Sequence, residues 1–196
     1  MEINKHTLEY IDDTHTYIVD GVIVPSITQM LKVKFGGKYN GVSKATLENA
    51  ANKGTEVHEA IERYCRNGEE SDLKEVRNFK FLQKRYGFSV SKNEVPVILF
   101  KDNEPIAAGR LDLVLYKDVY GLGDIKRTAT LDKNYLAYQL NLYRIAYMQC
   151  YGGKIDFLRG VHLRDDTRKY VDIPINEAAA WEIVDLYFKE VNNDKE

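Results

Sequence analysis

Apolar residues alternate with polar ones over parts of the chain, and elsewhere they recur every three or four positions. The first pattern is typical of β-strands and the second of amphipathic helices. The patterns predict, in chain order, a hairpin over 7–25, a short helix capped by Ser26 or Thr28, a basic glycine-containing loop, a helix over 43–66 with an interruption near Gly54, a helix over 72–86, strands over 93–100, 106–116 and 120–126, a helix over 133–150, a hairpin over 155–175, and a last helix capped by Asn176.

This order of elements, without repeats or linkers, predicts one domain over residues 1–196. The expected fold class is α/β (α+β mixed), with helices packed on a central mixed β-sheet. Residues 1–31 would form an N-terminal hairpin and short helix. Residues 43–150 would form the core, and residues 155–191 a further hairpin and the C-terminal helix.

Composition indicates a folded globular protein, with 44% hydrophobic and 11% aromatic residues. The two cysteines, Cys65 and Cys150, are too few for a four-cysteine metal or iron–sulfur site. The start of the chain lacks the apolar run of a signal peptide, and no stretch approaches membrane-spanning length. We therefore expect a cytosolic protein with reduced thiols and no iron–sulfur cluster.

Two acidic residues and a lysine are the strongest candidates for chemistry. The segments Gly109–Asp112 and Gly123–Lys126 each read as a strand, separated by a turn about position 118. Such a hairpin would place Asp112 opposite Asp124, and Lys126 on the same face as both. Two like charges opposite each other destabilise a strand pair, whereas a divalent cation between them removes the repulsion. The pattern therefore favours a metal site with a lysine beside it.

The Asp-x-Lys tripeptide by itself is weak evidence, because 30% of the residues are charged. A second copy, Asp72-Leu73-Lys74, lies where a helix is predicted and has no upstream acidic partner. An ordinary solvated face is the alternative interpretation of either copy.

Two residue pairs with helical spacing lie on the flanking segments. His58 and Glu62 are four apart, as are Gln139 and Tyr143, so each pair shares a helix face. A neutral imidazole is a good ligand for a transition metal. Taken alone, His58 would be read as a surface or half-buried histidine, Gln139 as a surface amide and Tyr143 as a core residue.

The net charge of −2 does not by itself suggest nucleic acid, but residues 32–53 contain five lysines and one acid, a local charge of +4. Lysines neutralise phosphates, and aromatic rings stack on unpaired bases. The candidates for contact with nucleic acid are Lys32, Lys34, Lys38, Tyr39, Lys44 and Lys53. A solvated loop is the alternative interpretation.

These features occur in the order Gly-xxx-His, Gly-xx-Asp, Asp-x-Lys and Gln-xxx-Tyr over residues 54–143. In this order the chain resembles the PD-(D/E)xK nuclease superfamily, and within it the RecB-like and phage exonuclease branch. The opening hairpin, which ends in Val24-Pro25-Ser26-Ile27-Thr28, also resembles the start of phage-encoded members. The resemblance implies a restriction-endonuclease-like core and a bacterial or phage-infected cell.

The resemblance also implies roles for individual residues. His58, Asp112 and Asp124 would bind a divalent metal, Mg²⁺ or Mn²⁺, as one or two ions, together with the backbone carbonyl of Ile125. Lys126 would hold or activate the attacking water. Gln139 and Tyr143 would support the site or contact the substrate, and Glu94 matches an acidic position common in such enzymes. Glu62 is a further candidate.

The activity implied is that of a metal-dependent deoxyribonuclease, an exonuclease acting on DNA ends in recombination or DNA processing. The alternatives are an endonuclease using the same site, a nuclease fold that only binds nucleic acid or protein, and a metal-dependent phosphoesterase acting on small molecules. DNA, single- or double-stranded, is the expected partner, and no membrane is expected. A second copy of the chain or a recombination protein are further candidate partners. Polarity of digestion and strand preference stay open.

Overall fold

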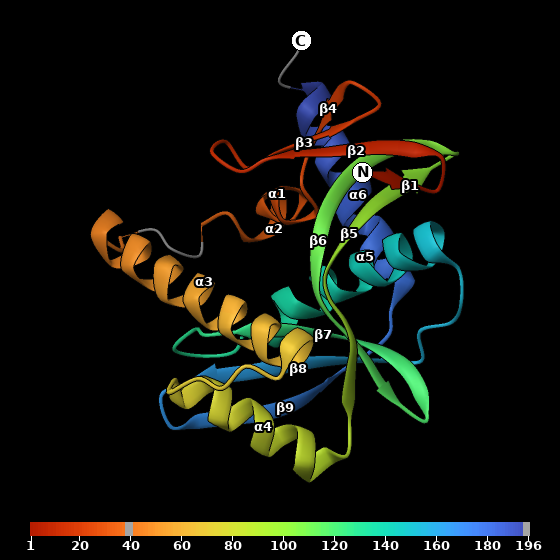
Figure 1. The fold of residues 1–196 in the computed structure, drawn as a ribbon. Coiled ribbons are helices and arrows are strands. Elements are labelled where there is room, and N and C mark those ends of the chain that lie inside the picture. The colour runs from red at the N-terminus through yellow and green to blue at the C-terminus, as the bar shows by residue number, and fades with distance from the viewer. Residues whose placement is uncertain (38–40, 194–196) are drawn as a thin grey trace.

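The computed structural model of the chain describes residues 1–37 and 41–193, which form two β-sheets and six helices (Figure 1). In chain order the elements are β1 (Glu2–Ile3), β2 (His6–Ile11), β3 (Thr16–Val19), β4 (Val22–Val24), α1 (Ile27–Met30), α2 (Lys32–Phe35), α3 (Lys44–Asn67), α4 (Lys74–Tyr86), β5 (Ser89–Lys101), β6 (Glu104–Lys117), β7 (Val119–Lys126), α5 (Lys133–Tyr151), β8 (Phe157–Arg164), β9 (Thr167–Ile173) and α6 (Glu177–Asn193). Within these described residues, no helix is long and apolar enough to cross a bilayer.

The larger sheet has the strand order β5-β6-β7-β8-β9 and is mixed, because β7 and β8 are parallel while the other neighbours are antiparallel. Helices α5 and α6 pack on one face in a core that contains Leu122, Leu140 and Leu158. Helices α3 and α4 pack on the other face in a core that contains Ile61, Phe79 and Val161. The predicted α/β architecture, a mixed sheet flanked by helices, is confirmed.

The N-terminal strands form a smaller antiparallel sheet in the order β1-β2-β3-β4. Leu8 and Val19 of this sheet pack against Ile98 and Phe100 of β5, so the predicted N-terminal hairpin is joined to the larger sheet by a shared core. The helix that follows begins with a capping box at Ser26, whose hydroxyl accepts a hydrogen bond from Gln29 N at 3.0 Å.

Two local predictions are wrong. Helix α3 runs without interruption from Lys44 to Asn67, through Gly54. One glycine in a helix costs about 1 kcal/mol relative to alanine, which is too little to break a helix held by packing at Val57 and Ile61. The segment after Leu31, expected as a loop, begins with the short helix α2, because Phe35 packs against the core beside α5.

Strands β6 and β7 are paired only near their shared turn, and this determines where the site lies. Their register joins Lys117 to Val119 and continues as far as Leu113 and Gly123, as predicted for a turn about position 118. Further along β6, beyond its pairing with β7, Ala108 N donates to Pro25 O at 3.0 Å. There the N-terminal segment, and not β7, is the neighbour of β6. Figure 1 shows β6 continuing toward the N-terminal sheet while β7 runs across the molecule.

Two glycine substitutions should have opposite effects on stability. Gly54 lies in the interior of α3 with nothing near an added Cβ, so Gly54→Ala should raise the free energy of unfolding by about 0.5–1 kcal/mol. A Cβ on Gly109 would lie 2.9 Å from Tyr143 Cε1 and 3.0 Å from its hydroxyl. Because Tyr143 is buried, Gly109→Ala should lower the free energy of unfolding by about 1–3 kcal/mol.

Urea unfolding of both variants beside the wild type measures the two changes. A destabilised Gly54→Ala would mean that the helix does need an irregularity at that position. An unchanged Gly109→Ala would mean that Tyr143 does not pack closely against the strand.

Candidate metal centre

A histidine and two carboxylates meet where α3, β5 and β6 come together. One ligand atom each from His58 of α3, Glu94 of β5 and Asp112 of β6 lies within 4.8 Å of the others. His58 Nδ1 lies 3.6 Å from Glu94 Oε1 and 3.7 Å from Asp112 Oδ2. The three residues can hold a metal ion, and two of them, His58 and Asp112, belong to the metal set implied by the resemblance.

Hydrogen bonds hold this cluster in place. His58 Nε2 lies 3.1 Å from Ile125 O, and because a carbonyl can only accept, Nε2 carries the hydrogen and Nδ1 faces the carboxylates. Ile125 N donates to Asp112 Oδ2 at 2.7 Å. Ile125, expected to offer its carbonyl to the metal, therefore orients both His58 and Asp112 through its backbone, as the outer partners of metal ligands commonly do.

Glu94 is held by a residue that the sequence interpretation missed. Arg110 Nε lies 2.7 Å from Glu94 Oε2, so the guanidinium fixes the carboxylate that faces His58. Arg110 is two residues from Asp112 on the same strand, and this spacing alone could have placed both side chains on one face.

The backbone of Glu94 has φ of 48°, in the left-handed region that strand residues rarely adopt. Such a conformation costs about 1–3 kcal/mol and persists where the surrounding structure imposes it. Here it accompanies a carboxylate held between Arg110 and His58.

The charges in the cluster set the protonation of His58. Burial alone would lower the pKa of the imidazole, but the negative charges of Asp112 and Glu94 outweigh this effect and raise the pKa to about 9. Without a metal, the protonated ring therefore balances the carboxylates at neutral pH.

The spacing of the donors is compatible with one metal ion held by all three residues. Ligand atoms around one six-coordinate ion at about 2.0–2.4 Å lie roughly 3–5 Å apart, and the distances from His58 Nδ1 to both carboxylates fall in that range.

Asp124 and Lys126 form a separate ion pair beside the cluster, in which the carboxylate is buried and the lysine partly exposed. The Lys126 ammonium is ion-paired with Asp124 Oδ2, and the Asp124 side chain is 3% exposed. Burial raises the pKa of the Asp124 carboxyl, with the Lys126 charge opposing and the Asp112 charge adding to the rise. Burial lowers the pKa of Lys126, but the charges of Asp124 and Asp112 outweigh it, so the ammonium stays charged.

Asp124 thus lies near Asp112 without belonging to the three-residue metal group. The sequence interpretation placed Asp124 directly across from Asp112, but strand pairing stops one position earlier. Asp112 instead accepts a hydrogen bond from Ile125 N, and the Asp124 carboxylate forms an ion pair with Lys126.

Helix α5 presents Gln139 and Tyr143 to the same region, as their spacing predicted. Both are 5% exposed, and Gln139 Oε1 has no hydrogen-bond partner within the described ranges 1–37 and 41–193. Tyr143 packs against Gly109, and burial together with the charges of Asp112 and Asp124 raises the pKa of its hydroxyl well above the ordinary value. Glu62, the further candidate, is engaged with Arg66 at 2.5 Å.

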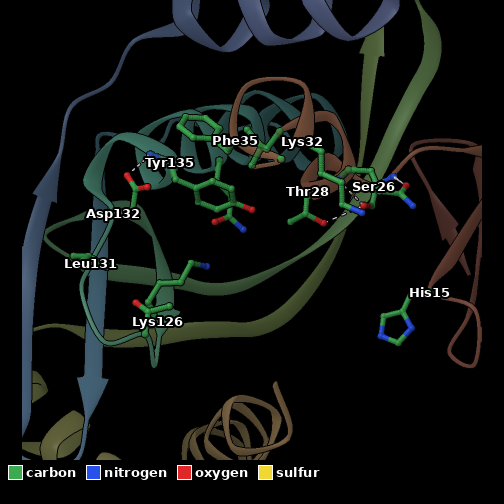
Figure 2. A pocket seen from close by; sticks show the side chains of 14 residues that line it. His15, Ser26, Thr28, Lys32, Phe35, Lys126, Leu131, Asp132 and Tyr135 are labelled. Carbon is green, nitrogen blue, oxygen red and sulfur yellow. Dashed lines mark hydrogen bonds between the residues drawn. The ribbon is translucent and has the colours of Figure 1, made fainter. Parts of the chain in front are cut away.

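A cavity of about 510 Å³ opens beside Lys126 and Gln139. Its walls come from the N-terminal segment, including Ser26, Lys32 and Phe35, and from the start of α5 with the loop before it. Figure 2 shows Lys126 reaching into the space from one wall, Tyr135 and Phe35 across from it, and His15 on the far side. A second cavity, of about 640 Å³, lies by Glu94 and Arg110.

The lysines expected to contact nucleic acid are distributed unevenly. Lys32 lines the first cavity, whereas the Lys34 ammonium donates to the Tyr138 hydroxyl at 2.7 Å and pairs with Glu182 at 3.2 Å. Lys44 and Lys53 lie on the exposed first half of α3, which extends away from the sheets (Figure 1). Lys38 and Tyr39 lie outside the described residues.

Comparison with known proteins does not assign a family. No protein-family model matches the chain, and no curated protein matches it. Among solved structures, the chain is similar to "Crystal structure of SSO0001", with a TM-score of 0.48 and 13% sequence identity over 85% of this chain and 76% of that one. A likeness of this degree carries no statement about function.

Proposed function

We propose that this protein is a divalent-metal-dependent deoxyribonuclease that hydrolyses phosphodiester bonds at DNA ends. The observation that carries the proposal is that a metal-capable group of side chains lies beside an ion-paired acid and lysine. His58, Glu94 and Asp112 form the first, and Asp124 with Lys126 the second. Lys126 also lines the cavity, so the charged ammonium faces a space that a substrate can enter.

His58, Glu94 and Asp112 would hold a Mg²⁺ or Mn²⁺ ion, and the charge of Asp124 lies near enough to Asp112 to influence the site. When bound, such an ion supplies positive charge that offsets the charge of the phosphate in the transition state and acidifies a bound water. Ile125 and Arg110 keep His58, Asp112 and Glu94 in position through the contacts described above.

Lys126 is the residue of this chain that acts on the reacting atoms. Its pKa is raised by Asp124 and Asp112, so it provides a fixed positive charge for the attacking water and for the developing charge on the phosphate. The buried Asp124 carboxylate fixes the position of the ammonium. Tyr143 packs against the strand that carries Asp112 and limits its movement.

Nucleic acid as the substrate is supported by lysines around the cavity and on α3. Lys32 stands at the cavity, and Lys44 and Lys53 stand on the exposed part of α3, where phosphates of a longer strand could reach them. Such contacts make binding depend on salt, because each neutralised phosphate releases counterions.

Digestion of an end-labelled linear DNA and a closed circular DNA, each with Mg²⁺, Mn²⁺ or EDTA, tests the proposal. We expect metal-dependent loss of the linear DNA while the circle survives. Cutting of the circle would keep the chemistry and change the class to endonuclease. Absence of cleavage on every substrate with either metal would contradict the proposal, and salt-sensitive DNA binding in Ca²⁺ would then indicate a binding module.

A further inference from the structure

The cavity beside Lys126 combines features that a phosphate group alone does not require. Its volume of about 510 Å³ suits a ligand of one or two nucleotides and is too small for a section of double helix. It is lined by aromatic rings and an amide as well as by Lys32 and Lys126.

The aromatic wall is built by Phe35 of α2 and Tyr135 of α5. Their ring centroids are 5.3 Å apart with an interplanar angle of 74°, so the edge of one ring meets the face of the other. Both side chains are half-buried and line the cavity, as Figure 2 shows. Aromatic surface of this kind stacks on nucleobases and is tolerant of their sequence.

Gln139 requires a hydrogen-bond donor from whatever fills the cavity. Its side chain is 5% exposed, lines the cavity, and has an oxygen without a hydrogen-bond partner among residues 1–37 and 41–193. A buried acceptor of this kind is costly unless a donor reaches it. Phosphates and deoxyribose rings inside a DNA strand offer no donor, whereas an unpaired base and the hydroxyl at a strand end do.

The positive charges complete the match. Lys32 is exposed at the cavity and has no ion pair within the described part of the chain, while Lys126 reaches in from the opposite wall. The charge of Lys126 is partly balanced by Asp124, and Asp132 also lines the cavity, so Lys32 is the main candidate to meet a phosphate. With aromatic rings and an acceptor in the same space, this arrangement fits a nucleotide whose base lies near Phe35.

We propose that this cavity binds the unpaired terminal nucleotide of a single-stranded DNA end, with its base against Phe35 and Tyr135 and a base or end hydroxyl donating to Gln139. The inference rests on the proposed nuclease function and adds the form of substrate, a strand end with an unpaired base. It also gives the N-terminal segment a role, since α1 and α2 supply one wall.

Binding without cleavage tests this proposal. Single-stranded oligonucleotides carry a fluorescent label in the middle and an abasic nucleotide at the 5′ end, the 3′ end or an internal position. Their affinities are measured by fluorescence anisotropy in EDTA and in Ca²⁺. We expect loss of the base at one end to weaken binding about tenfold, and loss of an internal base to have a smaller effect.

Phe35→Leu keeps an apolar side chain in the wall and removes the ring, so it should abolish most of this preference for a base at the strand end. Phe81→Leu is the matched control, because Phe81 lies exposed on α4, outside the cavity lining, and should keep the preference. Circular dichroism and urea unfolding of both variants show whether they fold alike.

Equal effects of end and internal abasic positions would overturn the proposal, as would an unchanged preference in Phe35→Leu or no DNA binding in either solution. The outcome is separate from that of the cleavage test. DNA digestion without an end preference would leave the nuclease proposal standing and reject this site. An end preference in a protein that cuts no DNA would support this binding site and contradict the nuclease proposal.

Discussion

Replacing Lys126 by alanine is expected to lower the rate of DNA cleavage at least about 100-fold, the usual effect of removing a charge that stabilises a transition state. The ammonium is paired with the buried Asp124 carboxylate and faces the cavity, so its position is fixed where the proposed substrate enters. The measurement is the initial rate on an end-labelled linear DNA in Mg²⁺ and in Mn²⁺.

Alanine at position 126 also leaves the Asp124 carboxylate buried without its partner, and breaking such a pair can cost about 3–5 kcal/mol of stability. Lys126→Gln is therefore the second variant, since glutamine still donates a hydrogen bond to Asp124 but carries no charge. It should fold and still lose cleavage. A rate near that of the wild type in folded Lys126→Gln would show that the charge is not needed.

The chain supplies its own matched control in the second Asp-x-Lys sequence. Lys74 begins α4, and its side chain is 58% exposed and paired with Asp166 at 3.3 Å. Lys74→Ala should cleave at the wild-type rate, because the pair lies on the surface and contributes about 1 kcal/mol or less. Loss of the lysine is therefore expected to stop cleavage in Asp124-Ile125-Lys126 and to leave it unchanged in Asp72-Leu73-Lys74.

Addition of Mn²⁺ is expected to raise the melting temperature by roughly 5–11 °C when the ion is present at about 100 times its dissociation constant. The reason is that, in the proposed site, the ion would bind the assembled cluster of His58, Glu94 and Asp112, which the unfolded chain does not present. Differential scanning calorimetry with increasing Mn²⁺ or Mg²⁺ measures the shift.

Asp112→Asn should remove most of this shift. The asparagine carbonyl can still accept the hydrogen bond from Ile125 N, so the local fold is kept while a charged ligand is lost. Asp166→Asn is the control, since Asp166 is 93% exposed in the turn between β8 and β9 and should leave the shift intact. A full shift in Asp112→Asn would place the ion elsewhere.

Much of the fold followed from local patterns in the sequence. Ser26 and Asn176 cap the helices that their positions predicted, and the turn about position 118 set the register of β6 and β7. These features depend on residues close together in the chain, so spacing and side-chain type suffice to predict them. Gly54 was misread, because a single unfavourable residue is outweighed by the packing of the helix around it.

The candidate site was predicted in part. His58, Asp112 and Glu94 were singled out, but the sequence did not show that these three form one group while Asp124 pairs with Lys126. That division depends on the point at which β6 and β7 separate, where Ile125 N bonds to the Asp112 side chain. Lys34 likewise looked free to bind phosphate, and only the fold brings it to Tyr138 and Glu182.

The sequence by itself determined the order of the elements, the strand register at the turn and the residue types that a metal site and a phosphate-binding lysine need. The tertiary structure alone decided which of those residues meet, that Arg110 holds Glu94, and that Phe35 and Gln139 share one cavity with Lys126. Segments far apart in the chain come together through packing on the sheet, and no local spacing encodes those distances.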